Sequence, residues 1–189
     1  MNNIIEHSQL IVDEKVTIRC NQYTIYDTNQ RIIGHAEETK NFLRYLLNRQ
    51  MIPLTLNIYG ADDQLITSLH RGWTFWLPKW TVSDSTGNVI ALLKSKLKLF
   101  KSETQILNPN GYQIATIFGD WKAWEFVIND ADNRQIGSIS KQWNGAMKEI
   151  FTTADKYLVS LEPTLTDPML RTIVASVAIV VDSMFKESK

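Results

Sequence analysis

The last apolar segment of the chain, residues 169–185, constrains the fold more than any other feature. Its sequence, MLRTIVASVAIVVDSMF, is apolar on nearly every face of a helix, and Asp167 and Pro168 stand before it as a predicted N-cap and first helical residue. A membrane span needs about 20 predominantly apolar residues, whereas the run without charge is only Thr172–Val181. A helix that is apolar all round must be buried. The segment therefore predicts a buried core helix over 168–185, with a membrane span as the alternative.

The sequence before this segment is typical of a row of β-hairpins. Five stretches alternate apolar or aromatic residues with polar ones on both sides of a short polar turn. The residues expected at these turns are Asp27, Asp62, Asp84, Asn108 and Asp130. The first interval between turns is the longest, and residues 37–50 occupy it. There, Phe42 and Leu46 at helical spacing before Pro53 predict a short amphipathic helix.

Hairpins at near-constant spacing predict a fold class as well as local structure. A meander of about ten or more strands usually closes into a barrel or splits into a sandwich, and a barrel of this size has a lumen that suits a helix. We therefore predict a mainly β fold, an antiparallel closed β-barrel of about 12 strands around the buried C-terminal helix. It would form a single domain over residues 10–186, after an N-terminal tail of residues 1–9. Exposure of residues 173–181 to water would contradict this fold.

Composition excludes several classes of function. Twenty basic residues balance twenty acidic ones, so the chain has no overall field that attracts nucleic acid. The three histidines lack metal-ligand spacing, and no nucleophile motif or phosphate-binding loop is present, so we expect no enzymatic activity. The single Cys20 excludes an internal disulfide, and the first residues do not resemble a signal peptide. We expect a cytoplasmic protein, either free or peripheral on the membrane.

The most specific motif lies in residues 137–185. Its landmarks, in order, are Gly137, Ile139, Ser140, Lys141, Trp143, Gly145, Glu149, Phe151, Thr152, Ala154, Asp155, Met169, Asp182, Met184 and Phe185. This block closely resembles the C-terminal block of the phospholipid scramblase family, and the resemblance extends over roughly residues 10–185. That family belongs to the tubby-like, LURP-one-related proteins, so the resemblance implies a barrel around a central C-terminal helix. It also implies movement of phospholipids between leaflets, or lipid and protein binding in less active relatives.

The resemblance further implies a calcium loop at residues 153–164, but the residues there do not suit one. Calcium needs several oxygen ligands, typically carboxylates at early alternate positions and a final acidic residue. Here the first and twelfth positions are Thr153 and Thr164, and Asp155 is the one carboxylate at an expected early position. We therefore expect a plain strand and turn there, without calcium, and no other cofactor.

Two groups of residues are candidates for contact with lipid. The first is an aromatic group that suits the bilayer interface, or alternatively packs on the core as a hairpin corner. Its members are Trp73, Phe75, Trp76 and Leu77, flanked by Arg71 and Lys79. The second is a lysine row on one face of a predicted strand, which would attract anionic head groups or merely keep an exposed strand soluble. Its members are Lys94, Lys96, Lys98 and Lys101.

Two functions remain open at this point. The first is a scramblase-like protein that associates with membranes and binds or redistributes phospholipids between leaflets without calcium control. The alternative is a soluble tubby-like module that binds a ligand or a protein and moves no lipid, because fold alone does not fix function. The expected partner is a phospholipid membrane surface, with anionic lipids favoured.

Overall fold

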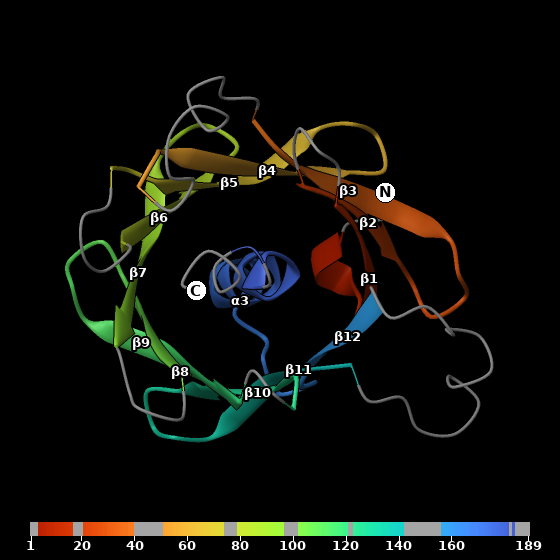
Figure 1. Cartoon of the computed structure of the whole chain (residues 1–189). Coiled ribbons are helices and arrows are strands. Elements are labelled where there is room, and N and C mark those ends of the chain that lie inside the picture. Colours follow the sequence, from red (N-terminus) through yellow and green to blue (C-terminus); the bar gives the residue numbers. More distant parts are fainter. Residues whose placement is uncertain are drawn as a thin grey trace.

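The chain folds into one closed antiparallel barrel of twelve strands around its C-terminal helix (Figure 1). The computed structural model describes residues 4–16, 21–39, 51–73, 79–96, 102–120, 123–141, 156–181 and 183. The strands are β1 (Gln9–Val16), β2 (Asn21–Tyr26), β3 (Ile32–Glu38), β4 (Leu54–Gly60), β5 (Leu65–Arg71), β6 (Lys79–Asp84), β7 (Val89–Lys96), β8 (Ser102–Leu107), β9 (Gln113–Asp120), β10 (Glu125–Asp130), β11 (Gln135–Ser140) and β12 (Lys156–Leu161). Each strand pairs with its neighbours in sequence, and β1 closes the barrel against β12. The predicted fold class is confirmed.

The two ends of the barrel differ because successive strands run in opposite directions. At one end, here named the turn end, tight turns join each even-numbered strand to the next odd-numbered strand. At the other, the linker end, the connections span residues 17–20, 39–53, 72–78, 97–101, 121–124 and 141–155. The C-terminal helix α3 (Pro168–Ile179) follows β12, so it enters the lumen from the turn end and runs towards the linker end.

The same turn occurs five times at the turn end. In the first, Asp27 N–H donates to Arg31 O, and Gln30 N–H donates back to Asp27 O. The fourth residue of each turn has a positive φ of 58–89°, which is a type I turn followed by a left-handed bulge residue. These residues are Gln30, Asp63, Gly87, Gly111 and Asn133. Four of the predicted turn residues begin a turn, whereas Asp62 is third in a turn that Gly60 begins.

The helix α3 begins where the sequence predicts. Asp167 Oδ1 accepts the backbone N–H groups of Met169 and Leu170 at 2.8 and 3.1 Å, which makes Asp167 the N-cap of a helix with Pro168 at its first position. No helix in the described part of the chain is long and apolar enough to cross a membrane. The last residues of the predicted span, 184–185, lie outside the described residues.

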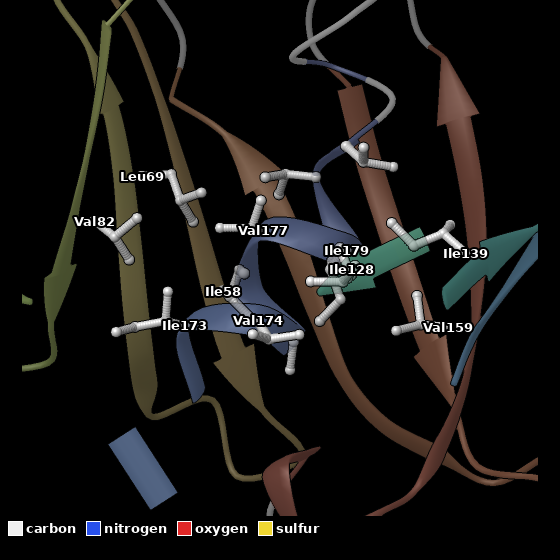
Figure 2. Close-up of a cluster of buried hydrophobic side chains, with 14 of the residues drawn as sticks. Ile58, Leu69, Val82, Ile128, Ile139, Val159, Ile173, Val174, Val177 and Ile179 are labelled. Atoms are coloured by element: carbon white, nitrogen blue, oxygen red, sulfur yellow. The ribbon is translucent and has the colours of Figure 1, made fainter. Parts of the chain in front are cut away.

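The core of the barrel forms between α3 and the inward side chains of the strands. All residues from Ile173 to Val181 are buried, as the predicted core helix requires. Figure 2 shows Ile173, Val174, Val177 and Ile179 of α3 among Ile58, Leu69, Val82, Ile128, Ile139 and Val159 of the strands. Since each large aliphatic side chain gains about 1.5–3 kcal/mol from full burial, this contact holds the helix in the lumen.

Polar contacts fix the position of α3 along the barrel axis. Arg171 is partly buried, and its guanidinium donates to the carbonyl oxygens of Ile5, His7 and Leu165, the last two at 2.9 and 3.3 Å. Residues 4–6, which we expected in an N-terminal tail, form the 3-10 helix η1 (Ile4–Glu6) beside α3 (Figure 1). The side chain of Ile4 is buried in the same core.

Further hydroxyl contacts lie deeper in the lumen. Ser176 of α3 bonds to Thr67 of β5 at 2.8 Å, and Ser183 bonds to Tyr23 of β2 at 2.5 Å. The Tyr157 hydroxyl donates to Ile179 O at the end of α3. A rotation or a shift of the helix by one turn would break all of these bonds, so they specify a single register of the helix in the lumen.

The predicted short helix over residues 37–50 begins too early. Glu37 and Glu38 belong to β3, where Glu37 pairs with Gln22 of β2 and with Asn57 of β4. The two ladders hold these residues in the sheet, so the amphipathic pattern does not extend to them. Residues 40–50 of the predicted helix lie outside the described residues.

Candidate functional site

Two lysines face each other on the outer surface near the linker end. Lys79 of β6 and Lys94 of β7 are direct partners in the register, and both are exposed, whereas their neighbours Trp80 and Leu93 are buried in the core. Directly opposed side chains have Cβ atoms about 4.5–5.5 Å apart, and like charges in this position destabilise a sheet. On its other side, Lys94 pairs with Gln105 of β8. An anion that binds both ammonium groups would relieve their repulsion.

An exposed tryptophan lies at the same end of the barrel. Trp73 follows the last residue of β5 by two positions and is 56% exposed. Because Arg71 of β5 pairs with Trp80 of β6, Trp73 leaves the sheet at the end where Lys79 begins its strand. The other predicted members of the aromatic group, Phe75, Trp76 and Leu77, lie outside the described residues.

The predicted lysine row is only partly described. Lys94 is exposed, as a binding residue must be, and Lys96 ends β7 opposite Glu103 of β8. Lys98 and Lys101 lie outside the described residues. The described geometry therefore centres the candidate site on Lys94.

Arg71 does not belong to this surface, although its sequence position beside the aromatic group predicts a cation at the membrane interface. Its side chain is 2% exposed and points into the barrel. The guanidinium donates to Ile52 O at 3.0 Å and lies 5.5 Å from the ring centroid of Trp80. The reason is strand alternation, since Arg71 shares the inward side with Trp80 while Lys79 takes the outward one.

The segment that corresponds to the calcium loop of the family contains a strand. Residues Lys156–Leu161 form β12, which pairs with β1 on one side and β11 on the other. Thr164 is exposed near the start of α3, whereas Thr153 and Asp155 lie outside the described residues. The described residues contain no cluster of three or more His, Cys, Asp or Glu side chains that would hold a metal. The lack of calcium binding stays a prediction.

Sequence reasoning placed Lys79 beside the aromatic group but missed its pairing with Lys94. The hairpin between β6 and β7 has a five-residue turn and a register shift between Val82 and Ser83. A shift of one residue in the pairing of two strands moves every side chain to the other face. The partner of Lys94 can therefore be predicted only when the position of the bulge is known. The glycine at position 87, which has a positive φ, is the one local signal for that bulge.

The fold defines the class of protein first: a closed antiparallel barrel around a central apolar helix, which is the tubby-like architecture. A model of the Scramblase family matches residues 8–188, and the chain belongs to this family. Among solved structures, one from Arabidopsis thaliana is similar with a TM-score of 0.56 and 9% sequence identity. The match covers 93% of this chain and 90% of that one. At this identity the likeness establishes the fold alone.

Proposed function

We propose that this protein associates peripherally with membranes through its linker end and binds or redistributes phospholipids without calcium control. The observation that carries the proposal is the opposed pair Lys79 and Lys94 at the same end as the exposed Trp73. Membership of the Scramblase family supports the same substrate class. The chemistry is noncovalent, in keeping with a family and a fold that are not known as enzymes.

The electrostatic part of this proposal rests on the lysine pair. A phosphate group between Lys79 and Lys94 accepts hydrogen bonds from both ammonium groups and removes their mutual repulsion. Near an anionic surface each lysine gains about 1 kcal/mol, an amount that falls as salt is added. The ring of Trp73 suits the interface between head groups and acyl chains.

Calcium independence is proposed from the residues of the degenerate loop. Thr164 at its twelfth position carries no charge, and the six residues of β12 already use their backbone groups in two ladders. A loop that wraps a cation needs those carbonyl groups free and several carboxylates besides. Lipid binding therefore depends on the lysine pair rather than on a metal switch.

A second candidate is a tubby-like binding module that moves no lipid. The observation that favours it is the burial of α3, the apolar helix, which Arg171 and Ser176 tie to the rest of the barrel. Moving α3 out of the lumen and into a membrane would expose the many apolar side chains of the strands that now pack on it, and each would lose about 1.5–3 kcal/mol of burial free energy. On this account the protein binds the membrane surface or another ligand without opening its lumen.

Leaflet-specific bleaching of a fluorescent lipid separates the two candidates. The purified protein is reconstituted into vesicles that carry the dye in both leaflets, and a membrane-impermeant reductant is added with calcium or with chelator. Redistribution predicts loss of inner-leaflet dye in sealed vesicles, to the same extent in both conditions. Loss of only the outer-leaflet dye, with incorporation verified, would favour the binding module, and a response only in calcium would contradict calcium independence.

A further inference from the structure

Two hollows flank the first turn of α3 at the turn end of the barrel. One has a volume of about 340 Å³ and is lined by Asp84 and Ile90 of the β6–β7 hairpin together with Pro168, Met169 and Thr172. The other has the same volume and lies against the β10–β11 hairpin. Its lining includes Asp130, Arg134, Ile136, Leu165, Asp167 and Leu170. The N-terminal turn of α3 thus separates two depressions of a size that suits large side chains.

Both hollows combine apolar walls with acidic groups. Ile90, Ile136 and Leu165 are buried in the core that the hollows reach, and Met169, which lines the first hollow, is 60% exposed. An apolar side chain this exposed at the mouth of a barrel gains free energy when a partner covers it. The apolar surface therefore offers anchoring positions on both sides of α3.

Carboxylates outnumber cations around the hollows. Asp84, Asp130 and Asp167 line them, and the one guanidinium, that of Arg134, already bonds to Asp130 and to Asp132 at 2.8 Å. Hydrogen bonds within the turns hold the pKa of Asp84 and of Asp130 below the ordinary range, so both stay ionised at neutral pH. Negative charge repels the anionic lipid surface that suits the linker end.

We propose that the turn end is a docking surface for a basic peptide segment of a partner protein, one that carries apolar side chains between lysines or arginines. The apolar side chains enter the two hollows on either side of the first turn of α3, and the cations lie against Asp84, Asp130 and Asp167. The argument is charge complementarity together with the apolar walls. This surface lies at the opposite end from Lys79 and Lys94, so it stays accessible on a protein that is bound to a membrane through the linker end.

The test measures fluorescence anisotropy of a labelled peptide built from lysine and leucine with one tryptophan. The triple variant D84N/D130N/D167N removes three charges and keeps an oxygen that accepts the backbone N–H groups of each turn and of the helix cap, as Asn108 does naturally in the fourth turn. It is expected to weaken binding of this peptide by about tenfold or more. Peptides with glutamate for lysine, or with serine for leucine and tryptophan, are expected to bind at least about tenfold more weakly.

Matched variants distinguish binding at this site from nonspecific binding and from binding at the lipid site. M169S is expected to weaken binding, whereas I32S, at a residue with the same exposure beside another turn, is not. K79E/K94E is expected to bind the peptide as the wild type does, whatever its effect on lipid. Unchanged affinity of the folded triple variant, or equal effects of M169S and I32S, would overturn the proposal. Sedimentation of the wild type and of the triple variant completes the test. If the wild type self-associates and the triple variant does not, the partner at this surface is a second copy of this chain and the proposal of a basic peptide is overturned.

Discussion

At the scale of single residues, the five hairpin turns show what the backbone demands of a side chain. Each turn needs a left-handed residue at its fourth position, and only two of the five have glycine there. A side chain with a Cβ in this conformation costs about 1–2 kcal/mol, although Asn and Asp tolerate it better than most residues do. Gln30, with a φ of 62°, is the residue least suited to its position.

We therefore expect Q30G to stabilise the protein by about 0.5–1 kcal/mol, the strain relieved less the entropy that glycine loses on folding. Urea unfolding should show a higher midpoint at an unchanged slope. The control is T28G in the same turn, where the backbone has no positive φ, and it should lower the midpoint. Lower stability of Q30G would show that its side chain contributes more than the strained backbone costs.

The turn carboxylates make stability depend on pH. Burial raises the pKa of Asp27, but hydrogen bonds from Arg31 and Asn29 outweigh it and lower the pKa below its ordinary 3.8. The Thr86 hydroxyl bond lowers the pKa of Asp84, and the Arg134 amide that of Asp130. The pKa values of these groups are lower in the folded state than in the unfolded state. The stability that they contribute is therefore present at pH values above the pKa of the unfolded state, and it is lost as the pH falls through the pKa values of the folded state.

The variant D27N/D84N/D130N should accordingly lose less stability than the wild type on acidification. Asparagine keeps the amide acceptor but does not titrate, so the free energy of unfolding should fall less steeply below about pH 4. Unfolding by urea at a series of pH values measures both slopes. Parallel curves for the two proteins would mean that these three carboxylates do not bind protons differently in the folded and unfolded states.

At the scale of elements, Arg171 shows why α3 stays in the lumen at one register. Its guanidinium joins the first turn of the helix to η1 and to the segment after β12, through three backbone carbonyl groups. We expect R171M, which keeps most of the side-chain volume, to destabilise the protein by about 2–4 kcal/mol. R134M removes an exposed guanidinium and should change stability by about 0.5 kcal/mol or less. Equal effects of the two substitutions in urea unfolding would contradict the role of Arg171.

Hairpins and the apolar helix were predictable at this scale because each leaves a periodic signal. Alternation located five strand pairs, and Asp167 followed by Pro168 located the start of α3. The strand β12 lies in the segment where a plain strand and turn were predicted, but its pairing with β1 joins residues from the two ends of the sequence, and no local pattern reveals that pairing. For the same reason η1 escaped prediction, because only the closed barrel brings Ile4 against α3.

The candidate site was predicted in part. Lys94 and Trp73 follow from local sequence, since alternation and aromatic content reveal exposed cations and rings. The pairing of Lys94 with Lys79 depends on a bulged register, and the inward orientation of Arg71 depends on which face of β5 is buried. Neither is encoded within a few residues of the side chain concerned.

At the scale of the whole molecule, the two candidate surfaces lie at opposite ends of the barrel and differ in charge. The linker end presents Lys79, Lys94 and an exposed tryptophan, while the turn end presents Asp84, Asp130 and Asp167 around an exposed methionine. On the proposed function, this arrangement orients the chain at an anionic surface although its acidic and basic residues are equal in number. We expect the linker end to face the lipid and the turn end to face away from it.

Flotation with vesicles of phosphatidylcholine, with and without phosphatidylserine, tests this orientation most directly. The wild type should float with the anionic vesicles equally in calcium and in chelator, and K79E/K94E should weaken its binding by about tenfold or more. The control R31E/R134E changes the net charge by the same amount at two exposed positions of the turn end and should bind as the wild type does. Equal binding of the wild type and K79E/K94E would contradict a membrane site at the linker end.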